Sequence, residues 1–214
     1  MYIDTLFYYQ KRYGLIFYRQ SGEIMYVADD TTTLRGDSTE GLYLLSKIVL
    51  DKNVQDVIWN GLGRWSFDEF EVSEENEVFQ TREGVLYTKE GYDRHGKTNR
   101  KKMIELVACP TNVNSHDIMY GTRRIANCAF KGSRVSSLHI PDSVEEIGTN
   151  AFYFADNLKT IEIPLSLKKL GPQISRTPLV IRYSGKEFDS WNNLFVYLLD
   201  NGFEYKSYTI VKGR

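Results

Sequence analysis

Two segments of the chain share one pattern of apolar residues, proline and glycine, and this repeat is the strongest constraint on the fold. The segment "VSSLHIPDSVEEIG" (135–148) aligns without a gap with "LKTIEIPLSLKKLG" (158–171), 23 residues later. The matched pairs are Val135–Leu158, Leu138–Ile161, Ile140–Ile163, Pro141–Pro164, Val144–Leu167, Ile147–Leu170 and Gly148–Gly171. A period in the twenties is typical of leucine-rich solenoids, in which each unit contributes one short strand and a return segment.

Weaker copies of the same pattern extend the repeat toward the N-terminus. "RIANCAF" aligns with "EIGTNAF" at a spacing of 22 residues, and the one-residue difference falls in the loops "KGSR" and "YFADN". The apolar positions of the weaker units are Leu45, Ile48, Leu50, Val54, Val57, Phe67, Phe70, Val72, Val113, Ile118 and Ile125. His116 occupies a position that is usually apolar in such a unit. The sequence therefore predicts a repeat array over residues 45–172.

Two segments lie outside the regular period. Residues 83–110 are predicted to form a hairpin insertion, with strands at 85–88 and 103–108 and a long polar tip between them. Residues 1–44 contain a second pattern of two strands joined by a Ser-Gly turn, which indicates a hairpin-containing region. The sequence leaves open whether this region is a capping unit of the same solenoid.

The period ends after Gly171, and residues 173–214 are predicted to cap the array. "VIRYSG" is a plausible last strand, and "FEYKSYTIVK" is predicted to be one closing strand. The segment between them is predicted to be a helix that ends at Gly202. Its apolar face would hold Phe188, Trp191, Leu194, Phe195, Leu198 and Leu199. A cap of this kind covers the apolar edge that a solenoid would otherwise expose.

The units "IANCAF", "LHIPDSVEEIGTNAF" and "LKTIEIPLSLKKLG" resemble the BspA-like class of leucine-rich repeats. We therefore expect an α+β, mostly β fold: an irregular, right-handed leucine-rich repeat solenoid with short strands, loop or short-helix returns, inserted β-hairpins and a helical C-terminal cap. The resemblance also implies a function in protein binding or adhesion, since many such proteins are surface or secreted molecules of host-associated microbes.

The composition narrows the classes of partner. A formal net charge of −1 and 42% hydrophobic residues are typical of an ordinary globular protein, so we do not expect nucleic acid as a partner. The longest apolar run, at 41–50, is far too short to span a membrane. The start of the sequence shows no signal peptide, which favours the cytoplasm, whereas the family resemblance implies a surface or secreted location if a leader was removed. The sequence leaves the compartment and the oligomeric state open.

The sequence shows no pattern typical of a catalytic, cofactor or metal site. It has no Gly-x-Ser-x-Gly, phosphate-binding glycine loop or His-Glu-x-x-His motif, and "GLGRW" (61–65) matches no nucleotide fingerprint. The spacing of Cys109, His116, Cys128 and His139 matches no zinc site. The run at 74–77 is predicted to be a solvated turn. We predict a non-enzymatic binding module; the alternatives are an enzyme or carbohydrate-processing accessory with a site between the N-terminal region and the array, or a purely structural assembly module.

Two surfaces are candidates for binding, most simply of another protein and secondly of a glycan. Alternation along the strands predicts that one sheet face presents Glu69, Glu71, Asp117, His139, Thr160 and Glu162. The hairpin tip gathers Arg94, Lys97, Arg100, Lys101 and Lys102, which would suit an anionic glycan or a phosphate-bearing partner. For both surfaces the alternative interpretation is that these polar residues are simply solvated.

Overall fold

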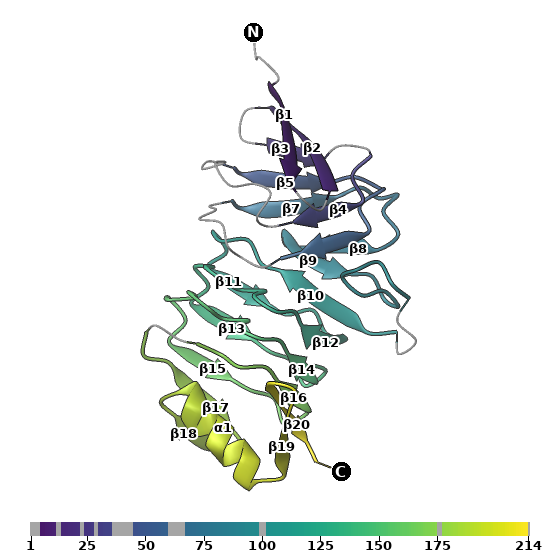
Figure 1. Ribbon diagram of the computed structural model, residues 1–214. Helices are drawn as coiled ribbons and strands as arrows, with labels where there is room; N and C mark the ends of the chain where they lie inside the picture. The colour runs from purple at the N-terminus through teal and green to yellow at the C-terminus, as the bar shows by residue number, and fades with distance from the viewer. Residues whose placement is uncertain are drawn as a thin grey trace.

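The protein is a stack of short coils that runs from N-terminal hairpins to a C-terminal helix (Figure 1). The computed structural model describes residues 5–11, 14–21, 24–27, 30–35, 45–59, 67–98, 102–174 and 177–213, and before residue 24 it describes the backbone alone. Each coil of the array contributes one strand to a first face and a second strand to the opposite side of the stack. The fold is therefore a mostly β solenoid, as the repeat predicts.

The first face is formed by the strands that follow the leucine-rich pattern. These strands are β3 (Ile24–Val27), β5 (Lys47–Leu50), β7 (Glu69–Val72), β11 (Ser115–Asp117), β13 (Ser137–His139), β15 (Thr160–Glu162) and β17 (Val180–Tyr183). They pair in parallel as three separate ladders, β3–β5–β7, β11–β13 and β15–β17. The register joins equivalent residues of successive coils, as in Ser115↔Ser137.

The return segments form a second set of parallel strands, so the short-helix returns allowed by the prediction are wrong. The strands are β4 (Thr33–Arg35), β6 (Asp56–Ile58), β10 (Ile104–Ala108), β12 (Thr122–Ile125), β14 (Glu146–Ile147) and β16 (Lys169–Leu170). They pair as β4–β6 and β10–β12–β14–β16. Backbone hydrogen bonds between coils satisfy the return segments, and α1 (Trp191–Asp200) is the one helix in the described part of the chain.

The apolar positions of the repeat line the inside of the coils. Val135, Val144, Ile147, Leu167 and Leu170 are all buried. Leu138 is only partly buried, although its counterpart Ile161 is covered. The periodic residues therefore form the core.

Gly148 and Gly171 are required by close approach between coils and not by an unusual backbone conformation. A Cβ atom at Gly148 would lie 2.5 Å from the backbone nitrogen of Asn127, and one at Gly171 would lie 2.5 Å from that of Thr149. Neither glycine has a positive φ. At both positions the neighbouring coil leaves no room for a side chain.

The inserted segment is part of the core. β8 (Phe79–Arg82) and β9 (Val85–Thr88) form a hairpin whose turn residues, Glu83 and Gly84, have φ of 53° and 74°. β9 then pairs antiparallel with β10, as predicted, and their side chains point alternately to two hydrophobic clusters. Leu86, Val107 and Ala108 belong to the N-terminal cluster, and Val85, Tyr87, Leu106 and Cys109 to the C-terminal one. The insertion thus separates two cores.

The N-terminal region joins the array through its last strand. β1 (Thr5–Lys11), β2 (Gly14–Ser21) and β3 form an antiparallel meander, and β3 is also parallel to β5. β4 extends the second set of strands in the same way. β3 and β4 therefore continue the coils of the array.

The C-terminal segment covers the last coil with a hairpin, a helix and a second hairpin (Figure 1). β18 (Lys186–Phe188) pairs with β17, so Phe188 lies on a strand and not on the predicted helix. Ser190 caps α1 by accepting a hydrogen bond from the backbone N–H of Asn193. Trp191, Leu194 and Leu198 are buried beneath α1, whereas Leu199 is 40% exposed and lies off the predicted apolar face.

The predicted single closing strand is a hairpin. β19 (Phe203–Lys206) and β20 (Thr209–Lys212) are antiparallel, and β20 pairs with β16 at the end of the eight-stranded sheet. Ser207 and Tyr208 form the tight turn between β19 and β20, and both have positive φ. Within the described residues no helix is long and apolar enough to cross a membrane.

Candidate functional site

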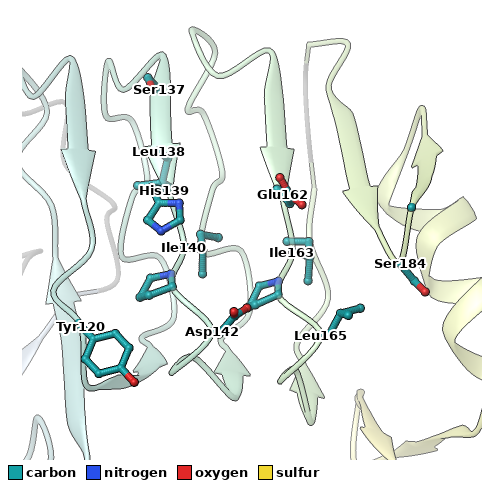
Figure 2. A pocket seen from close by; sticks show the side chains of 13 residues that line it. Tyr120, Ser137, Leu138, His139, Ile140, Asp142, Glu162, Ile163, Leu165 and Ser184 are labelled. Carbon is teal, nitrogen blue, oxygen red and sulfur yellow. The ribbon is translucent and has the colours of Figure 1, made fainter.

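A groove of about 770 Å³ lies on the first face, over β13, β15 and the turn between β17 and β18. Its floor is apolar and consists of Leu138, Ile140, Pro141, Ile163 and Pro164. Its rim carries Tyr120, His139, Asp142, Glu162, Leu165 and Ser184 (Figure 2). The groove therefore combines an apolar base with polar groups around its edge.

The groove lies where the strand pairing of the first face is interrupted. β13 belongs to a ladder with β11, and β15 to a ladder with β17 and β18. The interruption coincides with the coil that is one residue longer than its predecessor, in which Phe154 has a φ of 58°. On the return side, Ile140-Pro141 and Ile163-Pro164 follow the strands, and proline has no N–H to continue a ladder.

The side chains at the rim are exposed and form no hydrogen bond or ion pair within the described residues. Tyr120 is 81% exposed and Leu165 is 61% exposed, and both lie beside the apolar floor of the groove. The side chains of His139, Asp142 and Glu162 are exposed and form no hydrogen bond or ion pair with any described residue. Two uncompensated carboxylates give this groove a negative potential. The arrangement can accept hydrogen bonds from a cationic or polar group.

The N-terminal part of the same face is closed by its own ion pairs. Lys47 Nζ lies 2.8 Å from Glu69 Oε1 and 2.7 Å from Glu71 Oε2. The hydrogen bonds that Lys47 donates to Glu69 and Glu71 raise the pKa of its ammonium group above the usual value. Both carboxylates predicted to face a partner here are thus already paired.

The sequence-predicted face residues are divided by the structure. All six lie on the strands of the first face, but only His139 and Glu162 line the groove. Glu69 and Glu71 lie on β7 with Lys47. Asp117 is exposed on β11, in register with His139, and Thr160 is exposed on β15 outside the lining. Sequence alternation did not indicate Tyr120, Asp142, Leu165 or Ser184, because they lie in turns.

The hairpin tip lies against the array and does not project from it. The backbone N–H of Val57 donates to the carbonyl of Arg94 at 2.9 Å, and a Cβ atom at Gly96 would lie 2.6 Å from the carbonyl oxygen of Gln55. Asp93 Oδ1 accepts hydrogen bonds from the backbone N–H groups of His95 and Lys97. Arg94, Lys97 and Lys102 are described, whereas Arg100 and Lys101 lie outside the described residues. A shared anion site at this tip is therefore still a prediction.

A buried carboxyl group lies beneath the tip. Glu105 on β10 is almost fully covered, and burial raises the pKa of its carboxyl group, against the opposing effect of Arg124 and Arg94. Arg124 Nε lies 3.6 Å from Glu105 Oε1 and 3.9 Å from Glu146 Oε2. These charges compensate one another within the fold.

A buried histidine and tyrosine form a polar pair inside the core. His116 Nε2 lies 2.6 Å from Tyr87 Oη, and the backbone N–H of Met119 donates to the same oxygen at 3.3 Å. His116 Nδ1 lies 3.3 Å from Glu83 Oε2, but without the angles of a hydrogen bond. Burial lowers the pKa of His116 and raises that of Tyr87. The polar residue at an apolar repeat position was the sequence signal for this pair.

Asn76 is a structural residue that the sequence pattern did not identify. The exposed residues Glu74, Glu75 and Glu77 surround it, as expected for a solvated turn, but Asn76 itself is fully buried. Its amide nitrogen donates to the carbonyls of Asp51 and Val54, and its amide oxygen accepts from the N–H groups of Val78 and Phe79. One side chain thus joins two coils of the array.

The four residues considered as a metal set do not form one. His116 lies inside the array, whereas His139 on the adjacent strand points out. Cys109 and Cys128 are free thiols, and burial raises the pKa of both. Over the described ranges no three His, Cys, Asp or Glu side chains are placed to hold a metal ion. The alternative site between the N-terminal region and the array was predicted without named residues, and residues 28–29, 36–44 and 60–66, including "GLGRW", lie outside the described residues.

Comparison with known proteins relates the C-terminal half of the array to repeat proteins. Residues 108–175 match the family described as "BspA type Leucine rich repeat region (6 copies)". No curated protein matches the chain in sequence.

A solved structure shares the fold, and a second is similar in part. The pneumococcal vaccine antigen PcpA is 26% identical, with a TM-score of 0.52; the match covers 66% of this chain and 33% of that protein. A leucine rich cell surface protein from Faecalibacterium prausnitzii is 20% identical, with a TM-score of 0.49, over 67% of this chain and 42% of that protein. This chain therefore matches less than half the length of either protein.

Proposed function

Since residues 108–175 are BspA-type leucine-rich repeats, we propose that this chain is a non-enzymatic binding module that holds another protein in the groove over β13 and β15. One observation carries the proposal: the groove has an apolar floor and a rim of exposed side chains without partners. Exposed apolar side chains beside polar ones are typical of protein-binding surfaces.

The size of the groove suits a short part of a partner better than a whole domain. Its volume lies within the range of about 300–1,000 Å³ that is usual for ligand pockets. A loop or a chain segment of the partner would fit such a groove, and flanking strands of the first face would contact the rest of that partner. Four of the rim positions, Tyr120, Asp142, Leu165 and Ser184, lie in turns, where substitutions alter binding without disturbing the core.

Catalysis is not part of the proposal. A nucleophile needs an adjacent base within hydrogen-bond reach, and the base needs a group that orients it. In the groove, the side chain of His139 makes no hydrogen bond to a described residue, and Ser137 and Ser184 are not bonded to it. The apolar and polar groups of the groove suit contact with a partner.

A peptide selection tests whether the groove binds protein segments. We would select displayed random peptides on the immobilised protein and measure each clone against two variants. Tyr120→Ser with Leu165→Ser removes the exposed apolar groups of the groove, and Val196→Ser with Tyr205→Ser removes two comparably exposed groups from the C-terminal cap. We expect the clones to bind the groove variant about tenfold more weakly, the equivalent of ~1.4 kcal/mol, and the cap variant like wild type.

Three results would contradict the proposal. Clones that bind the groove variant as tightly as wild type would place the contact elsewhere. Clones weakened only by the cap variant would assign binding to the C-terminal hairpins. Sugar binding on a glycan array, lost in the groove variant while no peptide is selected, would make a glycan the partner.

A further inference from the structure

We propose that the groove holds an extended, basic segment of the partner, with a lysine or arginine side chain lying between Asp142 and Glu162. This inference rests on the proposed protein-binding function and specifies the chemistry of its partner. It follows from the charge of the rim, the shape of the floor and the length of the groove.

The negative charge of the groove has no counterpart within the described part of the protein. Neighbouring carboxylates are paired: Glu145 lies 2.7 Å from Arg123 Nη1 and 2.9 Å from Lys168 Nζ. Asp142 and Glu162 have no such partner, and Asp117 adds a further exposed carboxylate on β11. The uncompensated charge is thus concentrated on this part of the face.

The nearest strand cation does not neutralise the rim. Arg182 is in register with Glu162 on the adjacent strand β17. Its Nε lies 2.9 Å from Glu187 Oε1 on β18, with which it forms an ion pair. Glu162 is therefore left without a cation, although one lies on the next strand. A basic group from outside can take this position.

The floor suits the aliphatic part of a basic side chain. Ile140 and Ile163 lie beneath the groove with the two prolines that follow them (Figure 2). Lysine and arginine bury their methylene groups on such surfaces while the charged end stays at a polar rim. Tyr120 at one end offers an aromatic ring, which attracts a cation through its π face. An anionic phosphate group would be repelled by the same carboxylates.

The length of the groove favours an extended segment. It runs from Tyr120, in the coil of β11, to Ser184, at the end of β17 (Figure 2). Neighbouring strands lie about 4.8 Å apart, so three steps cover roughly 15 Å. This distance corresponds to about four or five residues of extended chain. A segment of that length contacts β13 and β15 together, across the interruption between their ladders.

Three labelled peptides of equal length test this inference directly. Alternating Lys-Pro, Gln-Pro and Glu-Pro sequences are extended and differ in charge. We would measure their binding by fluorescence anisotropy at low ionic strength and locate the contact from backbone amide shifts in NMR spectra. We expect the Lys-Pro peptide to bind at least about tenfold more tightly than the Gln-Pro peptide, and to bind more weakly as salt is added.

Paired variants separate the groove from general attraction. Asp142→Asn with Glu162→Gln should weaken binding of the Lys-Pro peptide about tenfold, because the charged rim is removed with little change in shape. Glu74→Gln with Glu77→Gln removes two exposed carboxylates from a turn outside the groove, and should leave the affinity within about twofold. Both variants change only exposed residues, so folding is expected to be retained, and circular dichroism checks it.

Two results would overturn the inference. Equal affinity for the Lys-Pro and Gln-Pro peptides would show that charge does not select the partner. Equal weakening by both pairs of variants would show that the attraction is not local to the groove. If peptides selected from the random library bind in the groove without basic residues, only this inference fails. If no selected peptide depends on the groove, the proposed function fails as well.

Discussion

The first face has two acidic parts that differ in how their charges are satisfied. In the N-terminal part, Lys47 lies between Glu69 and Glu71 and pairs with both. In the C-terminal part, Asp142 and Glu162 border a groove without any partner among the described residues. The two parts have similar residue types but different availability for an outside ligand. The difference teaches that on a repeat surface the pairing between coils, and not the charge of a position, decides which part can bind.

The halves also differ in what joins one coil to the next. In the N-terminal half, Asn76 connects chain segments through four hydrogen bonds to backbone groups. In the C-terminal half, glycines allow the backbones of neighbouring coils to approach closely, as at Gly148 against Asn127. The four-bond connection of Asn76 lies in the irregular half, whereas side chains in the half with the groove, such as Asn127 and Gln173, form one or two such bonds each.

The largest effect is expected from Asn76→Ala. This change leaves two buried carbonyls and two N–H groups without their partner, so the free energy of unfolding should fall by roughly 3–5 kcal/mol. Chemical denaturation followed by tryptophan fluorescence measures the change. The matched control is Asn157→Ala in the C-terminal half, where an exposed amide donates one hydrogen bond to the carbonyl of Arg134.

The control should cost less than about 1 kcal/mol, because water replaces the lost partner. If both variants lose the same stability, the polar connection is not specific to the N-terminal half, and the comparison between halves fails.

A smaller effect is expected from the two histidines on adjacent strands, of which His116 is buried and His139 is exposed. Burial lowers the pKa of His116 in the folded state, so the unfolded state binds a proton more readily. The free energy of unfolding should therefore keep its full value above about pH 6.5. Below that pH it should decrease, by at most about 1.4 kcal/mol per pH unit for this one group. Denaturation between about pH 7.5 and pH 5.5, roughly one unit on either side of the ordinary histidine pKa, measures the slope.

Replacement of both partners of the buried pair separates this histidine from other titrating groups. The double variant His116→Leu with Tyr87→Phe removes both polar groups together, so only the N–H of Met119 loses its acceptor, and the free energy of unfolding at neutral pH should fall by about 1 kcal/mol. Its pH slope should be shallower. A double variant that keeps the wild-type slope would assign the acid sensitivity to another group.

The smallest effect on stability is expected from Lys47→Met. The two carboxylates are about half exposed, so loss of the ion pairs should change the free energy of unfolding by less than about 1 kcal/mol. The variant leaves Glu69 and Glu71 unpaired, as in the groove, but without the apolar floor. The Lys-Pro peptide should then shift the amide signals of β7 only weakly, with an affinity at least about tenfold below that of the groove. Equal affinity at both places would show that unpaired charge alone makes a site.

Several features of the fold could be predicted from the spacing of apolar residues in the sequence. The buried positions from Leu45 to Leu170 follow the apolar repeat, because burial in a coil depends on spacing along the chain. The pairing of β9 with β10 was also predictable from two apolar segments around a polar tip. The predicted placement of Phe188 on the helix was wrong, because a short strand and a helix end have similar apolar spacing.

The candidate site was only partly predictable. His139 and Glu162 followed from strand alternation, since successive side chains point to opposite sides. Tyr120 and Asp142 lie in turns, where no period indicates a direction. The hairpin of the insertion was predicted, but not that its strands separate two cores, which they do because both sides of β9 are apolar and demand burial.

The sequence by itself determined the repeat, its length and the side of each strand that faces the core, because these depend on residues close together along the chain. The tertiary structure decided which charges are paired, where the ladder is interrupted and where a groove opens. These features depend on distances between coils that are separated by more than twenty residues, where a shift of a few ångströms makes or breaks an ion pair. Lys47 is therefore paired with Glu69 and Glu71, whereas Asp142 and Glu162 have no partner among the described residues.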